Sequence, residues 1–197
     1  MCFLDNLLPQ LRASGRARVI SVGGAGIETA RWLNIDDLNL ERPGAYGAMA
    51  SQTHMAMMST LTLERYAEMP ENESITFIHN NPGIVRTGNL YRGFDEGSWG
   101  SWAAAIFMDP ILMIVAYTFE ESTERHVYQV TSGTFGGEGP RVPGVTGITT
   151  RGKESGGLFL VSGKCDSVRN EWQLTKLRER GADVVAAKVK EIIGPYT

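Results

Sequence analysis

The sequence contains few cysteines, no cluster of basic residues and no uninterrupted apolar segment of membrane-spanning length. Its two cysteines, Cys2 and Cys165, lie at opposite ends of the chain with no His or Cys at ligand spacing. This pattern argues against a metal site or a disulfide scaffold and is typical of cytosolic thiols. The longest apolar run, 103–117, is interrupted by Asp109-Pro110, which argues against a membrane span.

The charge and the size of the chain narrow the class of protein further. The 19 basic and 22 acidic residues give a net charge of −3, so neither nucleic acid nor an anionic membrane is an expected partner. With 197 residues, 42% of them hydrophobic, the chain suits a single domain over 1–197 with a sizeable core. Residues 1–8 are apolar but carry Asp5 and no basic leader, so we expect no secretory signal and a cytoplasmic protein.

Hydrophobic periodicity predicts a long helix followed by a buried strand. From Tyr46 to Ala67, apolar side chains recur every three or four residues, as in a helix with one buried face. Residues 74–79 alternate polar and apolar side chains and include β-branched and aromatic members, which predicts a strand. Further helices are expected over 3–13, 120–130 and 170–193, the last interrupted near Gly181, and further strands over 18–22 and 158–162.

Two glycine-rich segments allow alternative interpretations. Residues 22–30 follow a predicted strand and look like a dinucleotide-binding turn, but Thr29 replaces the third glycine and no second strand follows until 74. A turn without a phosphate is therefore the favoured interpretation. Residues 133–157 are too rich in glycine for a helix or a regular strand. They predict a surface flap or a lid, with a hairpin over 142–150 as one option.

Several side chains of the long helix are candidates for a site. Tyr46 and His54 lie toward the same side of it, with Ser51 beside them. Met49 and Met57 would supply a flexible apolar wall. The simpler alternative is that Tyr46 and His54 are ordinary half-buried residues and that the methionines fill the core.

Candidates also follow the buried strand. Asn80 and Asn81 can hydrogen-bond a carbonyl or hydroxyl group, although asparagine is also a common turn residue. The additional candidate ligand contacts come from the Pro-Gly turn and from a Gly/Ser-rich loop, namely Arg86, Thr87, Trp99 and Trp102. Tryptophan in such a loop is costly unless it covers something apolar.

These segments carry a resemblance to a known family. The helix that follows Tyr46 and the strand that ends in Pro82-Gly83-Ile84-Val85-Arg86-Thr87 resemble the carboxy-terminal half of a short-chain dehydrogenase/reductase. Segments 61–67 and 77–83 are similar to a divergent fungal branch often found beside natural-product genes. The resemblance implies that the tyrosine of a Tyr-x-x-x-Lys helix is the catalytic acid and that the Pro-Gly turn holds a nicotinamide.

Three parts of that family's apparatus are not found in this sequence. The Gly-rich nucleotide-binding half is missing, Ala50 occupies the place of the lysine, and Val22-Gly23-Gly24 occupies the place of the catalytic serine. A phenol without the lysine, with a pKa near ~10, is a poor acid or base at neutral pH. The resemblance thus implies a truncated member with no nucleotide cofactor. Its expected fold is a partial Rossmann-like three-layer α/β unit with about three core strands flanked by helices.

Two functions compete on this basis. The first is a cofactor-independent cyclase or isomerase, such as a pericyclase of Diels–Alder type, that folds a hydrophobic terpenoid or polyketide intermediate of secondary metabolism. A carbonyl group of this intermediate would be polarised by Tyr46, His54, Asn81 or Arg86. The second is a non-catalytic pseudo-dehydrogenase that binds a partner enzyme or a small molecule. A weaker alternative is an NAD(P)-dependent oxidoreductase whose nucleotide half comes from a partner.

The predicted strand at 18–22 suggests an oligomer. In the family it would pair with a strand from the missing half, so here it becomes an exposed edge. We expect a homodimer that buries this edge or the long helix.

Overall fold

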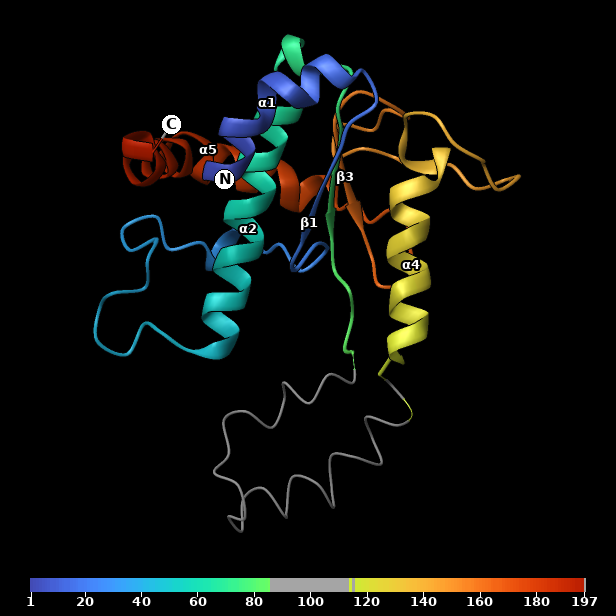
Figure 1. Ribbon diagram of the computed structural model, residues 1–197. Coiled ribbons are helices and arrows are strands. Elements are labelled where there is room, and N and C mark those ends of the chain that lie inside the picture. Colours follow the sequence, from blue (N-terminus) through green and yellow to red (C-terminus); the bar gives the residue numbers. More distant parts are fainter. Residues whose placement is uncertain (86–113, 115, 197) are drawn as a thin grey trace.

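The computed structural model describes residues 1–85, 114 and 116–196 and shows an α/β unit of three layers (Figure 1). Its strands are β1 (Arg18–Val22), β2 (Thr76–Asn80) and β3 (Leu158–Val161). Its helices are α1 (Cys2–Ser14), α2 (Ala48–Ala67), α4 (Phe119–Thr131) and α5 (Glu171–Ile193). Single 3₁₀ turns are η1 (Ala30–Trp32), η2 (Pro70–Asn72), η4 (Gly133–Phe135) and η5 (Gly194–Tyr196). The expected fold class is confirmed.

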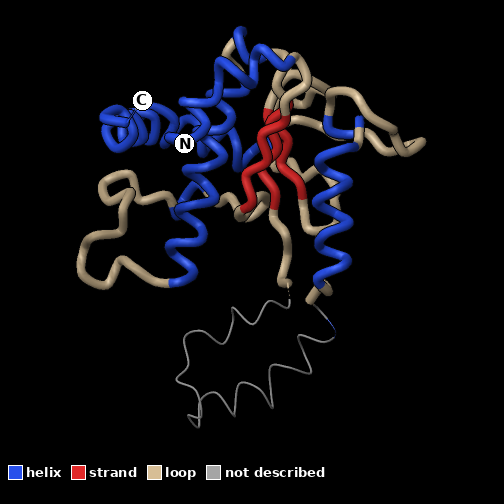
Figure 2. The backbone as a smooth tube through the Cα atoms, viewed as in Figure 1, coloured by secondary structure: helices blue, strands red, loops and turns tan. Residues whose placement is uncertain are grey.

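The sheet has three parallel strands in the order β1-β2-β3, and Figure 2 shows them side by side. Ile20 of β1 pairs with Ile78 of β2, which pairs on its other side with Phe159 of β3. Because the strands are parallel, their carboxyl ends lie at one edge of the sheet. Ligands of open parallel sheets bind outside that edge.

Alternate side chains of the strands form two separate cores. Phe77 and Leu158 belong to the larger cluster, which also contains Leu63 of α2. Ile78 and Phe159 belong to a second cluster on the opposite face of the sheet, where Tyr128 of α4 packs against it. The sheet therefore lies between α2 and α5 on one side and α4 on the other, as Figure 1 shows.

Helix α5 corrects one sequence expectation, because it runs without interruption through Gly181. A Cβ atom at this position would lie 2.3 Å from Leu33 Cδ2 and 3.2 Å from Leu61 Cδ1. The glycine therefore lets α5 approach η1 and α2 closely, and this tertiary packing outweighs the low helix propensity of glycine.

The glycine-rich segment 133–157 forms neither a helix, apart from η4, nor the hairpin considered over 142–150. Its first part lies against the amino end of β1, where the Arg18 guanidinium donates hydrogen bonds to the carbonyl groups of Ser132 and Gly136 (2.6 and 2.8 Å). Residues 137–146 are exposed. The segment is thus anchored at the sheet end opposite to the carboxyl edge.

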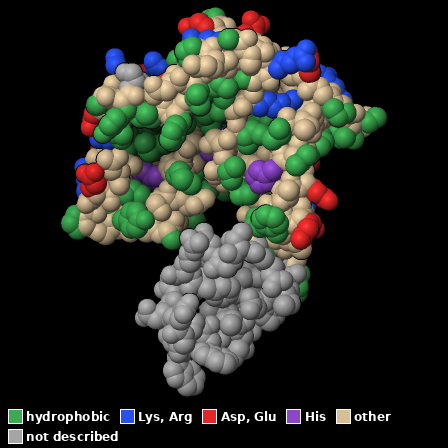
Figure 3. Space-filling model, in the orientation of Figure 1, with side chains coloured by type: hydrophobic (Ala, Val, Ile, Leu, Met, Phe, Trp, Pro, Cys, Tyr) green, Lys and Arg blue, Asp and Glu red, His purple; other side chains and the backbone are tan. Residues whose placement is uncertain are grey.

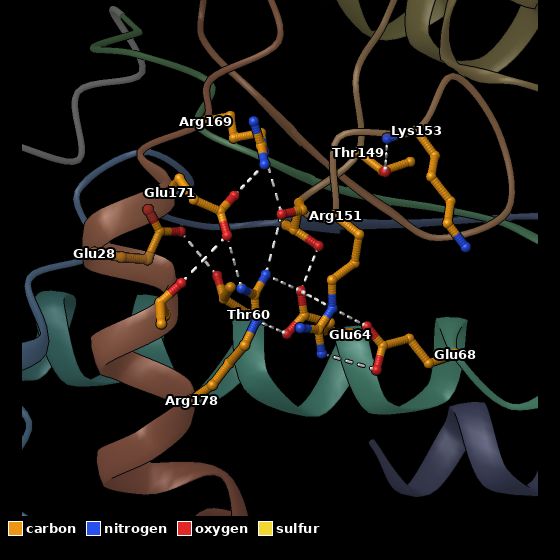
Figure 4. A network of polar contacts seen from close by, with 12 residues as sticks. Glu28, Thr60, Glu64, Glu68, Thr149, Arg151, Lys153, Arg169, Glu171 and Arg178 are labelled. Atoms are coloured by element: carbon orange, nitrogen blue, oxygen red, sulfur yellow. Dashed lines mark hydrogen bonds and ion pairs between the residues drawn. The ribbon is translucent and has the colours of Figure 1, made fainter.

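A buried carboxylate joins α2, α5 and the end of this segment (Figure 4). Glu64 of α2 receives two hydrogen bonds from Arg178 of α5 (Nε–Oε2 2.8 Å, Nη2–Oε1 2.7 Å) and one from the Thr150 hydroxyl. Arg151 lies 3.8 Å from the same carboxylate and pairs with Glu68. Burial alone would raise the pKa of Glu64, but the hydrogen bonds from Arg178 and Thr150 and the nearby guanidinium charges outweigh it and lower that pKa.

None of the helices in the described residues combines the length and the apolar character needed to cross a membrane. Most of the apolar run 103–117 lies outside the described residues.

Candidate functional site

A pocket of about 370 Å³ beside the first half of α2 brings together three of the predicted site residues, Tyr46, Ser51 and His54. Its remaining wall comes from the first residue of the chain, the loop before α2, α2 itself and α5, namely Met1, Leu38, Asn39, Leu40, Met55, Met58, Ser59, Thr62 and Val189. We call it the α2 pocket. Figure 3 shows hydrophobic side chains gathered on the face that α2 presents, with charged side chains mostly at its margins.

The two hydroxyl-bearing residues at the mouth of the α2 pocket are accessible. Tyr46 is 75% exposed and lies two residues before α2, because Gly47 is extended and the helix begins at Ala48 rather than at the tyrosine. The Ser51 hydroxyl donates to the Ala48 carbonyl (3.1 Å), which leaves its lone pairs free to accept. These groups can donate to and accept from a polar atom on an otherwise apolar ligand.

His54 has a structural role in this pocket. Its ring is 5% exposed, and its Nε2 lies 3.0 Å from the Trp32 carbonyl oxygen and 3.2 Å from the Asn34 amide nitrogen. In either tautomer the ring therefore fastens α2 to the loop that follows η1. Its Nδ1 is buried without a hydrogen-bond partner.

Asn80, the last residue of β2, and Asn81, which follows it, lie at the carboxyl edge of the sheet, apart from the α2 pocket. Asn80 is fully buried and its Nδ2 donates to Gln129 Oε1 (2.7 Å) and contacts His126 Nε2 (3.3 Å), both on α4. Its Oδ1 is buried without a partner. The Asn81 side chain accepts a hydrogen bond from the Gly83 amide (3.0 Å), which is turn chemistry.

The Pro-Gly turn depends on its glycine. Gly83 has φ +72° and a Cβ atom there would lie 2.6 Å from the Tyr117 ring. The guanidinium of Arg125 lies 3.5 Å above the centre of that ring. The turn is thus covered on one side by an aromatic side chain and a cation.

The remaining candidates fall into two groups. Met49 is 70% exposed and does not line the α2 pocket, whereas Met57 is fully buried in the core with Leu61 and Leu177. Met57 therefore packs the core, as the simpler interpretation proposed. Four candidates lie outside the described residues, namely Arg86, Thr87, Trp99 and Trp102.

The glycine turn after β1 does not fit the pyrophosphate of a dinucleotide. A Cβ atom at Gly23 would lie 3.0 Å from the His79 ring, and one at Gly24 would lie 3.0 Å from Ala56 Cβ. These glycines thus serve packing within the chain. Residues 23–47 contain the 3₁₀ turn η1 but no α-helix, so the turn has no helix amino terminus with which to bind phosphate.

Sequence reasoning missed two buried titratable groups near this turn. His79 of β2 is 1% exposed and neither ring nitrogen has a partner. Glu28 is 8% exposed and accepts hydrogen bonds from the Thr60 hydroxyl and the Gly26 amide, both 2.8 Å. Burial raises the pKa of Glu28 although these hydrogen bonds oppose the change. The only sign in the sequence that Glu28 is a special carboxylate is its position directly after a glycine turn.

No three His, Cys, Asp or Glu side chains in the described part of the chain are grouped so that they could hold a metal ion.

The three parallel strands, with helices on both faces of the sheet, define a Rossmann-like α/β unit. Comparison with known proteins adds that no family model matches the chain. The chain is 33% identical over 180 residues to the NmrA-like family domain-containing oxidoreductase notO of Aspergillus sp. (strain MF297-2), covering 91% of this chain and 49% of that protein.

Two further relatives are also fungal and also named oxidoreductases. Oxidoreductase AN1596 of Emericella nidulans is 30% identical over 208 residues, covering 100% of this chain and 57% of its own length. Oxidoreductase andH of Emericella variicolor is 36% identical over 138 residues, covering 68% of this chain and 37% of its own. The chain spans about half the length of the curated relatives it matches. These relatives support the expected kinship with a divergent, reductase-like fungal branch.

Proposed function

We propose that this chain forms the substrate-binding part of an oxidoreductase that acts on an apolar small molecule. The observation that supports this most strongly is the 33% identity to a fungal oxidoreductase over 91% of the chain. The relatives share the name oxidoreductase, so the proposal extends that activity from them to this protein.

The α2 pocket is the proposed substrate site. Its volume of about 370 Å³ lies within the roughly 300–1,000 Å³ typical of small-molecule sites, which are mostly apolar with a few polar groups. Leu38, Leu40 and Met58 would contact the apolar body of the substrate. The Tyr46 hydroxyl would donate a hydrogen bond to its carbonyl or hydroxyl oxygen, and Ser51 would accept one from a substrate hydroxyl.

A nicotinamide nucleotide supplies or accepts hydride in oxidoreductases of Rossmann-like fold. Since the turn at 23–26 does not fit its pyrophosphate, we place that pyrophosphate on none of the described residues. The chain's own contribution is to bind and orient the substrate.

A second candidate is a cofactor-independent cyclase or isomerase that uses the same pocket. Ala50 in place of a lysine four residues after Tyr46 and the misfit of the glycine turn favour it. Here an apolar natural-product intermediate would be folded into its reactive shape while Tyr46 polarises a carbonyl group.

Mass spectrometry distinguishes the two candidates. The purified protein is incubated, with and without NADPH, with apolar extracts of a fungus that makes secondary metabolites. Mass spectrometry then detects any new product. An oxidoreductase gives a product that differs from its substrate by two hydrogen atoms and forms only with the nucleotide. A product of unchanged mass that forms without nucleotide supports the cyclase or isomerase and contradicts the oxidoreductase.

Two matched variants localise the site. Tyr46→Phe removes the proposed donor and should lower turnover by about tenfold or more, the usual scale for one positioned donor. Tyr196→Phe is the control, because Tyr196 is similarly exposed (71% against 75%) but lies outside the α2 pocket. Equal turnover by both variants would show that Tyr46 is not part of the site. Both candidates would be contradicted if the unmodified protein neither turned over nor retained any apolar compound of the extract.

A further inference from the structure

A second and larger hollow, of about 670 Å³, lies between η1 and the first half of α5. Its residues come from two short stretches of chain, namely Thr29, Ala30, Arg31 and Trp32, and Trp172, Gln173, Lys176, Glu179 and Arg180. We call it the tryptophan pocket. It shares no residue with the α2 pocket.

Both tryptophans of this pocket present large apolar surfaces to solvent. Trp32 is 52% exposed and Trp172 is 66% exposed. Tryptophan is usually well buried on average, and exposed aromatic surface gathered at one place marks a binding site. Within the described chain, the structure records a cation above an aromatic ring only for Arg125 and Tyr117. The faces of the two indole rings are therefore not occupied by the neighbouring cations.

The charges around the two rings are mainly positive. Three cations, Arg31, Lys176 and Arg180, line the pocket with a single carboxylate, Glu179. Lys176 is paired with that carboxylate at 2.9 Å. Among the described residues, Arg31 and Arg180 have no carboxylate partner within salt-bridge distance. This local excess of positive charge lies on a chain whose net charge is −3.

The two sides of the pocket are fixed relative to each other. Gln173 Oε1 of α5 accepts a hydrogen bond from the Ala30 amide of η1 (3.2 Å). Next to Trp32, His54 Nε2 of α2 contacts the backbone at the Trp32 carbonyl oxygen (3.0 Å) and the Asn34 amide nitrogen (3.2 Å). A ligand would thus meet a largely preformed site, which lowers the entropic cost of binding.

We infer that the tryptophan pocket binds a flat aromatic anion. The ring of the ligand would stack on Trp32 or Trp172, and its anionic group would pair with the guanidinium groups of Arg31 and Arg180, which suit the planar geometry of carboxylate and phosphate. Both an aromatic carboxylic acid and a nucleoside phosphate have this chemistry.

Isothermal titration calorimetry with defined probes tests the inference. The probes are 2-naphthoate, its uncharged analogue 2-naphthalenemethanol, and AMP. We expect saturable binding of at least one anion and binding of the uncharged analogue at least about tenfold weaker, because two guanidinium groups can form charge-assisted hydrogen bonds with the anion but not with the alcohol. Tighter binding of 2-naphthoate assigns the site to aromatic acids, and tighter binding of AMP assigns it to nucleoside phosphates.

Three variants locate the binding. Arg180→Gln should weaken the preferred anion by about fivefold or more, and Trp172→Ala by about tenfold, since one removes an ion pair and the other a stacking surface. Arg16→Gln removes the same charge at an exposed position outside the pocket (76% exposed) and should change the affinity by less than about twofold. Circular dichroism verifies the fold of each variant. Equal affinity for charged and uncharged probes, unchanged affinity in both pocket variants, or no saturable binding up to millimolar concentration would overturn the inference.

Discussion

At the scale of single residues, His79 is a titratable side chain that the fold removes almost completely from water (1% exposed). Its ring packs against the backbone of Gly23, where a Cβ atom would lie 3.0 Å from Cε1, and neither nitrogen has a partner. Burial lowers the pKa of His79 from 6.5 to about 4, because the charged imidazolium has lost its hydration. The folded protein therefore favours the neutral ring.

This lowered pKa predicts a loss of stability in mild acid. Above pH 6.5 the ring is neutral in both states and His79 imposes no penalty. Between pH 6.5 and about 4 only the unfolded state takes up the proton, so the free energy of unfolding falls as the pH falls. A difference of this size between the two pKa values corresponds to a loss of about 3 kcal/mol across the window. Urea unfolding at pH 7 and at pH 4.5 measures most of this loss in the free energy of unfolding.

Replacing the ring separates His79 from other titrating groups. His79→Leu should flatten the stability profile over this window, whereas His126→Gln, which changes a half-buried histidine on α4, should leave the fall in place. The same fall in His79→Leu as in the unmodified protein would show that other groups cause it.

At the scale of elements, the packing of α5 depends on one glycine. Gly181→Ala places a Cβ atom 2.3 Å from the fully buried Leu33. Overpacking of this kind costs roughly 1–3 kcal/mol, and the better helix propensity of alanine returns about 1 kcal/mol. We therefore expect a net loss of up to roughly 2 kcal/mol in the free energy of unfolding.

The control for this prediction lies at the end of the same helix. Gly194 immediately follows α5, and a Cβ atom at this position would have no other atom within 4 Å. Gly194→Ala should therefore be neutral or slightly stabilising in chemical denaturation. If both variants lose stability equally, close approach to Leu33 is not the reason for glycine at 181.

The Glu64–Arg178 pair makes a stronger prediction about how α2 and α5 are held together. The exposed fractions of the two side chains are 6% and 13%, so removing the guanidinium leaves a carboxylate buried with less compensation. Arg178→Met should lower the free energy of unfolding by about 3 kcal/mol. Arg16→Met breaks an ion pair in which both side chains are exposed (76% and 72%) and should change it by less than about 0.5 kcal/mol. Similar losses in both variants would show that the buried Glu64–Arg178 pair does not hold α2 and α5 together more strongly than an exposed ion pair would.

Local pattern predicted most of these elements, and tertiary contacts account for what it missed. The strands expected at 18–22 and 158–162 match β1 and β3 within a residue, and the alternating stretch 74–79 matches β2 within two residues. The helix periodicity placed α2 correctly except at Tyr46, where the extended Gly47 delays the start. Pattern alone predicted a break at Gly181, since the close approach of Leu33 comes from a segment far away in the sequence.

The same distinction applies to the site. Helical spacing put Tyr46, Ser51 and His54 on one side of α2, and the structure places all three around one pocket. By contrast, the isolation of His79 depends on Gly23 across the sheet, and the tryptophan pocket depends on the meeting of η1 with α5. Neither relationship can be read from a single stretch of sequence.

At the scale of the whole molecule, the two edges of the sheet differ. The outer edge of β3 is covered by isolated antiparallel bridges from Thr149 to Phe159 and from Ser167 to Val161. All four residues of β3 are buried. β1 has a strand partner only on its β2 side within the described chain, its residues are half-buried, and its last residue, Val22, is 57% exposed. An open strand edge of this kind invites pairing with another chain.

We therefore predict that two copies associate through β1. Light scattering on the purified protein at about 10 µM should give the mass of a dimer, since two edges that pair satisfy each other's backbone groups. Val22→Lys places a charge at the end of that edge and should yield monomers with an unchanged circular dichroism spectrum, because a charged side chain, lysine especially, is a common means of blocking edge pairing. Met49→Lys, at an exposed position on α2 (70%), adds the same charge away from the edge and tests the alternative that the long helix forms the interface. If only Met49→Lys is monomeric, the interface lies on α2 rather than on β1. A monodisperse monomer of the unmodified protein would contradict the dimer.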